Sequence, residues 1–481
     1  MDVVSWPLIL LIGELVLKVV MIALVLLQRK KTSAAKLAWI LLIIFIPFIG
    51  TIIYLMLGTR RLGFIRRKRH KRIIAQIPQS VAEHGCAQKF ELGDVSPAYR
   101  SITTVAETVG AGFVLEDNHA LLFGDSDKLI HALAVDIDKS TQHCHILSYI
   151  MLEDDAGKLI ASALIRATAR GVVCRLLLDG MGSKDFLNSK TCRDLREAGV
   201  RVVAALPANI FRALLVRIDL RNHRKIAVID NSIGYMGSNN IAEPSFAPKP
   251  KFAPWVDASV RLTGPIVREL HAIFIQDWFM DSDEDLVEFL SEPIVCSGKG
   301  FPAQLMATGP NSNNQALSQL LQTAFFAAQE ELVITTPYFC PDDATESALL
   351  ICAKRGVQTH LVIPARNDSR LVAAASRSSF SKLIHAGVQI HEFHGGLLHA
   401  KTLTIDRKVA LIGSANLDRR SLELNFEVNM LVFDTDFASE LRFLQTSYME
   451  QSVPVLEENV ENWSIQTRLW QNAIGLIAPI L

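Results

Sequence analysis

The chain has 481 residues, half of them hydrophobic, which is enough for more than one domain. Lysine plus arginine equals aspartate plus glutamate, 49 each, so the net charge favours no class of partner. The seven cysteines are odd in number, widely spaced and without a C-x-x-C pair, which excludes a disulfide or zinc–cysteine framework and indicates reduced cysteines in a cytoplasmic compartment.

Two apolar stretches open the chain. Leu8–Leu27 carries only two charges, Glu14 and Lys18, whose i,i+4 spacing allows them to pair on one helix face. Twenty residues are long enough to span a bilayer, but the two charges nearly cancel the favourable transfer free energy. The sequence is therefore compatible with a helix that spans the bilayer and with one that lies shallow in its interface. Leu37–Leu57 has no charge and is predicted to be a membrane segment, which Pro47 either kinks or turns back.

Residues 1–59 are thus expected to form an N-terminal transmembrane helical hairpin, and the nearby basic residues predict its orientation. Four lie between the apolar stretches and eight follow the second: Arg29, Lys30, Lys31 and Lys36, then Arg60, Arg61, Arg66, Arg67, Lys68, Arg69, Lys71 and Arg72. The excess places both termini in the cytoplasm. The run is either a topology signal or a surface for anionic lipid headgroups. Residues 60–99 are expected to be a basic juxtamembrane region and, from Ile73 to Tyr99, an irregular linker.

Two halves of similar pattern follow, residues 100–295 and residues 296–481. In each half strands alternate with helices, which predicts an α/β fold with a mainly parallel sheet covered on both faces. Glycines end matching helices in the two halves, Gly171 with Gly356 and Gly199 with Gly387. The halves are therefore interpreted as an internal duplication.

Both halves carry the same polar motif, His-x-Lys-x4-Asp-x6-Gly-Ser-x-Asn. The first copy lies within Asn222–Asn240 and the second within His399–Asn416, at a constant offset of 399 − 223 = 176. The matching positions are His223, Lys225, Asp230, Gly237, Ser238 and Asn240, and then His399, Lys401, Asp406, Gly413, Ser414 and Asn416. A single His-x-Lys is usually surface decoration, but two copies with a shared tail indicate a functional site.

Alternation in each copy predicts a strand, a turn at the aspartate and a second short strand, so that the imidazole and the ammonium lie on one face. Lysine supplies charge for a phosphate, and histidine acts as a nucleophile or as an acid and base near neutral pH. The four side chains after the hairpins are expected to donate further hydrogen bonds to phosphate oxygens: Ser238, Asn240, Ser414 and Asn416. Asp230 and Asp406 complete the motif and are expected to be structural acceptors at the turns. No carboxylate, cysteine or histidine group has the spacing of a metal site, so neither a metal nor another cofactor is expected.

The duplicated H-x-K-x4-D motif resembles the signature of the phospholipase D superfamily, and the whole chain resembles its bacterial cardiolipin synthases. The block Trp255–Trp278 and the strand and loop Ile334–Asp343 carry further likeness, so the resemblance covers essentially the full length. It implies two duplicated phospholipase-D-like α/β/α domains that share one active-site cleft, attached to the bacterial inner membrane with the domains facing the cytoplasm. It also implies a C-terminal helix at Thr467–Leu481.

The resemblance further implies a phosphohistidine mechanism. His223 is the expected nucleophile and His399 the expected general acid and base, an order that spacing alone does not settle. Superfamily members orient each histidine with an acidic residue downstream of it. Asp257 lies 257 − 223 = 34 positions after the first histidine and Glu427 lies 427 − 399 = 28 after the second, so each is expected to orient the histidine of its own half.

The expected reaction is transfer of a phosphatidyl group from one phosphatidylglycerol to another, giving cardiolipin and glycerol. Alternatives with the same chemistry are phospholipase D hydrolysis and the use of another donor lipid or alcohol. A nuclease needs no N-terminal hairpin and usually shows a basic excess, so nucleic acid is not expected as a partner; a scaffold without catalysis has no reason to keep both motifs. The bilayer and anionic headgroups are expected partners, and a homo-oligomer stays open. The loop Pro244–Pro254 is a lid, a membrane contact or an ordinary surface loop.

Overall fold

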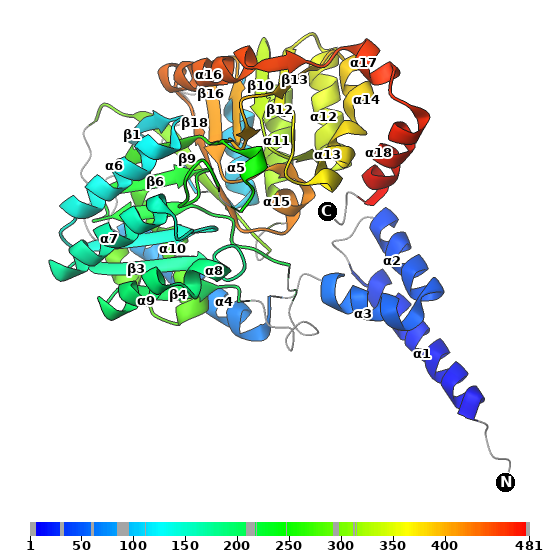
Figure 1. Cartoon of the computed structure of the whole chain (residues 1–481), viewed down its shortest axis with the longest axis horizontal. Helices are drawn as coiled ribbons and strands as arrows, with labels where there is room; N and C mark the ends of the chain where they lie inside the picture. Colours follow the sequence, from blue (N-terminus) through cyan, green and yellow to red (C-terminus); the bar gives the residue numbers. More distant parts are fainter. Residues whose placement is uncertain are drawn as a thin grey trace. The chain divides into compact units, whose positions relative to one another are not determined.

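The computed structural model describes residues 6–28, 33–58, 62–83, 96–110, 112–207, 217, 219–246, 248–291, 298–310, 313 and 315–477. The chain divides into two compact units (Figure 1). Unit 1 comprises residues 1–65 and 208–220, and unit 2 comprises residues 66–207 and 221–481. The predicted boundary between the halves, at residues 295 and 296, lies outside the described residues and stays a prediction.

Three helices form unit 1: α1 (Trp6–Leu26), α2 (Ser33–Phe45) and α3 (Pro47–Leu57). The second apolar stretch is therefore divided at Ile46, because a proline cannot continue the hydrogen-bond ladder of the preceding helix. Its kink was predicted, but the two separate helices were not. Glu14 and Lys18 form the predicted ion pair at 2.7 Å.

Among the described residues, none of the helices combines the length and the apolar character needed to cross a bilayer.

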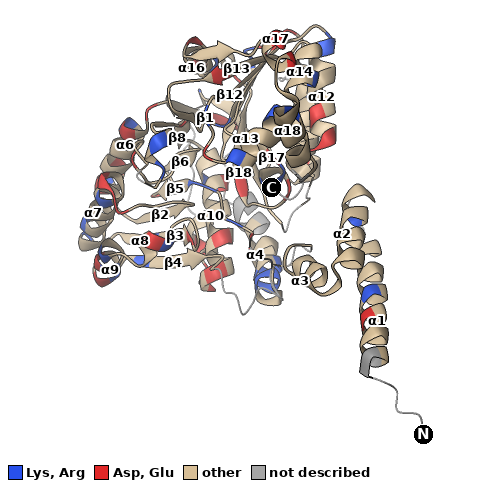
Figure 2. Cartoon of the chain, turned by 45° about the vertical axis from the view of Figure 1, so that its right-hand side comes forward, with Lys and Arg blue, Asp and Glu red and all other residues tan. Residues whose placement is uncertain are grey.

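Helix α4 (Phe64–Glu83) occupies much of the predicted linker, so the irregular structure expected from Ile73 onward is wrong as far as Glu83. It is the densely basic helix in Figure 2. Arginines at three-residue spacing pair with alternate aspartates at the C-terminal end of the helix α10 (Ile266–Ser282): Arg66 with Asp281, Arg69 with Asp283 at 3.0 Å, and Arg72 with Asp285 at 3.9 Å. Ile73 and Ile77 are buried in the core of unit 2. Three of the six basic residues from Arg66 to Arg72 thus hold the helix against the protein, and Arg67, Lys68 and Lys71 are exposed and take no part in these three pairs.

One fifteen-stranded sheet runs through both halves of unit 2. Its spatial order is β19-β13-β12-β10-β15-β16-β18-β9-β1-β8-β6-β5-β2-β3-β4. The first-half strands are β1 (Leu115–Phe123), β2 (His143–Ser148), β3 (Val173–Asp179), β4 (Arg201–Ala205), β5 (Ile226–Ile229), β6 (Ile233–Gly237) and β8 (Ser259–Thr263). The second-half strands are β9 (Phe301–Thr308), β10 (Glu331–Thr335), β12 (Gln358–Pro364), β13 (Gln389–Phe393), β15 (Thr402–Ile405), β16 (Val409–Gly413), β18 (Glu427–Val432) and β19 (Ser452–Pro454).

The sheet is mixed, and the prediction of a mainly parallel sheet is wrong. Within the described part of this sheet, parallel pairs occur in the outer part of each half: β3 pairs with β2 and β4, and β12 pairs with β10 and β13. The hairpins and the seam between the halves are antiparallel, and β9 joins them by pairing with both β1 and β18. The seam makes the two halves one continuous sheet (Figure 1), which brings their motifs to the same region.

Helices cover both faces, as predicted for an α/β/α arrangement. One face packs against α10 (Ile266–Ser282) and α16 (Thr435–Glu450). The other face of the first half packs against α6 (Ser126–Lys139), α7 (Asp155–Ala169) and α9 (Lys190–Glu197), and that of the second against α5 (Arg100–Val109), α11 (Ala316–Ala327), α12 (Asp343–Lys354) and α14 (Phe380–His385). Alternating residues of β5 enter opposite cores. Ile226 and Val228 pack in the core under α10, and Ala227 and Ile229 pack in the core under α6 and α7.

The remaining helices are α8 (Lys184–Leu187), α13 (Arg370–Arg377), α15 (Arg419–Glu423), α17 (Glu457–Glu461) and α18 (Ile465–Ile477). Two small sheets pair β7 (Trp255–Val256) with β14 (Leu397–Leu398), and β11 (Phe339–Cys340) with β17 (Leu417–Asp418). The pairing of β7 with β14 crosses from the first half to the second, and it lies directly before the second motif.

Candidate active site

Each motif forms the predicted hairpin, β5–β6 in the first half and β15–β16 in the second. The turn residues have positive φ, 48° and 51° at Asp230 and Asn231, and 52° and 53° at Asp406 and Arg407. Such turns suit the right-handed twist of two-residue hairpins. The histidine and lysine of each copy lie just before the first strand of the hairpin, at positions 223 and 225 and at 399 and 401, and not within it.

The aspartate of each motif holds a neighbouring loop. Asp230 accepts hydrogen bonds from the backbone N–H groups of Thr141, Gln142 and His143 at 2.7–2.9 Å. Asp406 accepts three in the same way, from Gln329, Glu330 and Glu331, and a fourth from the hydroxyl of Tyr99. Both carboxylates are saturated with donors at the far end of the hairpin, which fits the structural role expected of them.

The two histidines contact carboxylates of the opposite half. His223 Nδ1 lies 3.0 Å from Glu427 Oε2, and His399 Nδ1 lies 2.6 Å from Asp257 Oδ1. The expectation that each carboxylate serves its own half is therefore wrong, although both residues meet a histidine. His223 Nδ1 also lies 3.0 Å from the carbonyl oxygen of Ser414, which only accepts, so Nδ1 carries the proton and Nε2 keeps its lone pair.

Strand pairing explains the exchange. The segment before β5 bonds to the start of β18: the His223 N–H donates to the carbonyl of Phe426 at 2.9 Å, and Glu427 follows directly. In the other direction, the His399 N–H donates to the carbonyl of Val256 at 2.7 Å, next to Asp257. Each histidine therefore lies beside a strand of the other half.

The serines of the motifs hold these carboxylates, which differs from the phosphate contacts expected of them. Ser238 Oγ donates to Asp257 Oδ1 at 2.6 Å, and Ser414 Oγ donates to Glu427 Oε2 at 2.5 Å. Ser421 adds a donor to the other oxygen of Glu427 at 2.8 Å. The two asparagines are likewise engaged within loops: Asn240 Oδ1 accepts from the Ile150 N–H, and Asn416 Nδ2 lies 3.4 Å from Asp418 Oδ2.

The lysines are buried beside the histidines. Lys225 Nζ donates to the carbonyl oxygen of His223 at 2.7 Å, and Lys401 Nζ donates to that of His399. Burial lowers the pKa of Lys225 to about 8 and that of Lys401 well below its ordinary value. An anionic phosphodiester next to them supplies the negative charge that reverses this shift. Two buried ammonium groups are therefore set to bind an anion.

Burial also lowers the pKa of both histidines, that of His399 to about 4, against the opposing pull of the carboxylates. Burial raises the pKa of Asp257, but His399, Lys401 and Ser238 outweigh it and bring the value to about 2. Glu427 is held below its ordinary pKa in the same way by His223. In the empty site the histidines are neutral and the carboxylates ionised, which is the state that leaves a nucleophilic Nε2.

A buried ion pair lies directly beneath the first motif. Arg224, between His223 and Lys225, donates to both oxygens of Asp277 at 2.8 and 2.9 Å. It also donates to the carbonyl of Glu427 at 3.0 Å and to that of Thr308 at 2.9 Å. Ala400 takes the equivalent position in the second motif, so this connection exists in only one copy.

Aromatic rings complete the surroundings. The ring of Tyr149 meets that of His223 edge-on at 4.9 Å, and the indole of Trp255 lies 4.6 Å from the ring of His399. Sequence reasoning did not assign Tyr149, Trp255, Arg224 or Asp277 to the site. Two features of the sequence could have pointed to them: the block Trp255–Trp278, which contains Trp255 and Asp277, and the position of Arg224 between His223 and Lys225.

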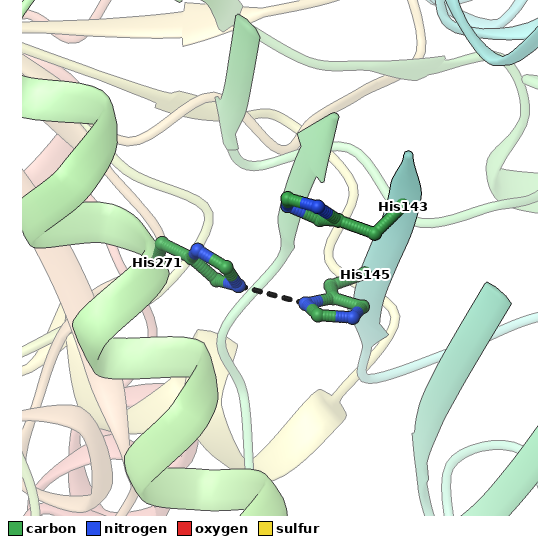
Figure 3. A group of neighbouring side chains, drawn as sticks. All are labelled: His143, His145 and His271. Atoms are coloured by element: carbon green, nitrogen blue, oxygen red, sulfur yellow. Dashed lines mark hydrogen bonds between the residues drawn. The ribbon is translucent and has the colours of Figure 1, made fainter. Parts of the chain in front are cut away.

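A second polar cluster brings three histidines together in the first half. His143, His145 and His271 are buried with their ring nitrogens close together (Figure 3). Arg175 only donates, so its bond of 2.9 Å to His145 Nε2 leaves the proton of that ring on Nδ1, which then donates to His271 Nε2 at 2.7 Å. That direction leaves no lone pair between the two rings. His145 and His271 thus satisfy each other, whereas both ring nitrogens of His143 are buried without a hydrogen-bond partner among the described residues.

Comparison with known proteins agrees with this geometry. A family described as "Cardiolipin synthase, PLD-like domain" matches residues 133–278 and 321–444, and one described as "Phospholipase D-nuclease N-terminal" matches residues 16–58. The cardiolipin synthase A of Wigglesworthia glossinidia brevipalpis is 36% identical over 442 residues, 91% of this chain and 88% of that protein. The cardiolipin synthase A of Yersinia pseudotuberculosis serotype O:1b is 33% identical over 95% of this chain and 94% of that protein.

Among solved structures, the fold is similar to that of a phosphatidylserine synthase from Haemophilus influenzae Rd KW20. The TM-score is 0.60 at 13% identity, and the match covers 80% of this chain and 98% of that one. This likeness concerns the fold of the chain.

Proposed function

The chain belongs to the cardiolipin synthase family of phospholipase-D-like phosphatidyltransferases and synthesises cardiolipin, and we propose that it does so by exchange between two phosphatidylglycerol molecules through a phosphohistidine. The observation that carries the mechanism is the pair of neutral imidazoles, each with Nδ1 on a buried carboxylate of the opposite half. Each imidazole is left with an Nε2 lone pair, one for attack on phosphorus and one for proton transfer.

In the first step, His223 Nε2 attacks the phosphorus of one phosphatidylglycerol. The N–P bond forms, the bond from phosphorus to the headgroup glycerol breaks, and His399 delivers a proton to the leaving oxygen. Lys225 and Lys401 balance the charge on the non-bridging oxygens. The anionic phosphodiester raises the pKa of His399 above its value of about 4 in the empty site, which allows that ring to carry the proton.

In the second step, His399 takes the proton from a glycerol hydroxyl of the second phosphatidylglycerol. The new O–P bond forms as the N–P bond breaks, which gives cardiolipin and frees His223. Asp257 stabilises the imidazolium while it holds the proton, and Glu427 does so for His223. The bonds broken and formed are alike, so the exchange is near equilibrium and excess glycerol reverses it.

The test is product analysis with the purified full-length enzyme and phosphatidylglycerol alone. Cardiolipin and glycerol in equal amounts, with no nucleotide-activated lipid present, are expected. Mostly phosphatidic acid would identify a phospholipase D, and product formed only with another donor lipid or alcohol would identify a different phosphatidyltransferase. A strict need for a cytidine-activated lipid would reject the exchange.

We further propose that unit 1 attaches the enzyme to the bacterial inner membrane and that unit 2 faces the cytoplasm. Several large apolar side chains on the helices of unit 1 are more than half exposed, among them Leu10, Leu11, Leu15, Phe45 and Phe48. In unit 2, α18 exposes an apolar stripe without acidic residues, formed by Ile465, Leu469 and Leu476 with Trp470 beside it. Both surfaces suit contact with lipid.

Cysteine labelling in intact cells tests this orientation. A cysteine placed at Lys71, on the exposed face of α4, is expected to react only after the inner membrane is made permeable. Labelling of that position by an impermeant reagent in spheroplasts would place the catalytic unit outside.

A further inference from the structure

The loop after the first hairpin forms a strap over the site. The strap comprises residues 244–246 and 248–254, and it lengthens the path from Asn240 to Asp257 to 17 positions, against 11 from Asn416 to Glu427 in the second half. The two ends of the strap are fastened together, because the Trp255 N–H donates to the carbonyl of Pro244 at 2.8 Å. Only the first half therefore has this element.

The strap turns an apolar surface toward one histidine. Phe246 and Trp255 stack with their ring centroids 4.0 Å apart, and Trp255 lies 4.6 Å from the ring of His399. Phe246 and Trp255 are 5% and 8% exposed, and Leu397 closes the same cluster from the second half. Nε1 of Trp255 is buried and has no hydrogen-bond partner in the described part of the chain. This buried cover of Phe246, Trp255 and Leu397 thus places the ring of Trp255 against His399 and leaves the indole N–H donor unused among the described residues.

The strap is also fastened to the second half. The Leu397 N–H donates to the carbonyl of Pro254 at 2.9 Å. Gly396 has φ +128°, and a Cβ there would lie 2.1 Å from the same carbonyl oxygen, so only glycine allows this approach. Farther along, Lys249 pairs with Asp368, whose carboxylate also accepts from the hydroxyl of Tyr338 at 2.7 Å. The Asp368 side chain is 3% exposed, which makes Lys249 and Asp368 a latch between strap and body.

The other histidine has no such cover. His223 faces the edge of Tyr149, and Lys225 Nζ lies 5.3 Å from the centre of that ring. Within the described ranges, the stack of Phe246 and Trp255 thus lies beside His399 and not beside His223, and His399 is the histidine that takes the proton from the incoming hydroxyl in the proposed mechanism.

We propose that the strap decides whether the phosphohistidine is resolved by a lipid alcohol or by water. In either case the acceptor O–H gives its proton to His399 Nε2, the O–P bond forms and the N–P bond to His223 breaks. A lipid hydroxyl gives cardiolipin, and water gives phosphatidic acid. The indole of Trp255 beside His399, with the ring of Phe246 stacked on it, displaces water from the position where it would be deprotonated, and an acceptor with an apolar body fits against this cover. This inference rests on the proposed function and adds the element that makes the site a transferase.

The test measures the ratio of phosphatidic acid to cardiolipin formed from phosphatidylglycerol by the full-length enzyme. Phe246→Ala opens the cover and Lys249→Met breaks the latch, and each is expected to raise the ratio about tenfold. Lys249→Arg keeps the ion pair and is expected to restore the wild-type ratio. Lys251→Met is the matched control, since Lys251 is exposed on the same strap and lies over the ring of Phe252.

An unchanged ratio in Phe246→Ala and Lys249→Met, with both products slowed equally, would overturn the proposal and make the strap a purely structural element. A raised ratio in Lys251→Met would do so as well, because it would show that any change in the strap admits water. Failure of the proposed function has a different signature, in which the wild-type enzyme itself forms no cardiolipin. In that case the ratio of hydrolysis to transfer is measured with a long-chain alcohol as the acceptor, which has an apolar body, and the same variants are expected to raise it.

Discussion

Glu427 meets His223 from 204 residues further along the chain, and from the other half of the duplicated fold. The exchange is reciprocal, because Asp257 of the first half meets His399 of the second. Neither half holds a complete histidine–carboxylate pair from its own chain segment. The site therefore exists only when the seam strands β9, β1 and β18 join the halves.

The exchanged pairs predict separate defects. A phosphatidyl donor that releases p-nitrophenol needs no acid in the first step, because p-nitrophenolate is a good leaving group. Asp257→Asn is therefore expected to keep the initial burst of p-nitrophenol. It is expected to slow turnover about a hundredfold, because the second step still needs His399 as a base. Glu427→Gln is expected to lose the burst, because His223 is no longer held in the attacking tautomer. Stopped-flow absorbance separates the two phases. A burst retained by Glu427→Gln and lost by Asp257→Asn would contradict these roles.

Arg224 and Asp277 are predicted to position His223 against Glu427. Removing one partner leaves a buried charge and costs about 3–5 kcal/mol of folding stability, whereas replacing both with apolar residues is near neutral. The double variant Arg224→Met with Asp277→Leu is therefore expected to keep the melting temperature within a few degrees and yet lower kcat with little change in KM.

The control for this pair is Arg442 with Glu331, a bidentate pair with both distances at 2.9 Å, at the start of β10 beside the turn of the second hairpin. The backbone N–H of Glu331, which donates to Asp406, is kept when the side chain is replaced. Arg442→Met with Glu331→Leu is expected to leave kcat unchanged. Equal loss of kcat in both double variants would show that buried ion pairs matter here only for the fold.

The histidine cluster predicts loss of stability in acid. Burial lowers the pKa of His143 to about 4 and lowers those of His145 and His271 well below their ordinary value, with the neighbouring histidines and Arg175 adding to the effect and Asp230 opposing it at His143. Below about pH 6.5 these histidines take up protons in the unfolded chain but not in the folded one. Their contribution to the free energy of unfolding is therefore complete above pH 6.5 and is lost as the pH falls from 6.5 to 4. For His143 alone the loss is about 3 kcal/mol at the lower limit.

Melting temperatures at pH 7 and pH 5 measure this loss. His143→Phe removes one titrating group from an aromatic environment and is expected to reduce the difference between the two pH values. His131→Gln, at an exposed position of α6, is expected to keep the wild-type difference. The same difference in His143→Phe as in wild type would place the acid sensitivity elsewhere.

Lys225 predicts the alkaline limit of substrate capture. Its pKa of about 8 in the empty site means that the ammonium is lost as the pH rises above 8, and kcat/KM for phosphatidylglycerol falls with it. Arginine stays protonated throughout this range, so the profile of Lys225→Arg, scaled to its own maximum, is expected to stay flat above pH 8. A fall with the wild-type midpoint in that variant would assign the limit to another group.

The duplicated motifs, their hairpins and the α/β/α layers were predictable, because spacing along a strand determines which side chains share a face. The partner of each histidine was not, since distance along the chain from His223 to Asp257 carries no information on which strands pair across the seam. Helix α4 was missed for a related reason. The charges that made residues 66–72 look like a lipid or topology signal are partly satisfied by Asp281, Asp283 and Asp285, more than 200 positions away.

The central claim, a phosphohistidine shared between the halves, is tested most directly by trapping it. Enzyme quenched during turnover with phosphatidylglycerol labelled at phosphorus is digested and the labelled peptide is sequenced. The account predicts an acid-labile phosphatidyl group on His223 in the wild type, none in His223→Ala and an unlabelled His399. Label on His399, or cardiolipin synthesis by His223→Ala within about tenfold of wild type, would contradict it.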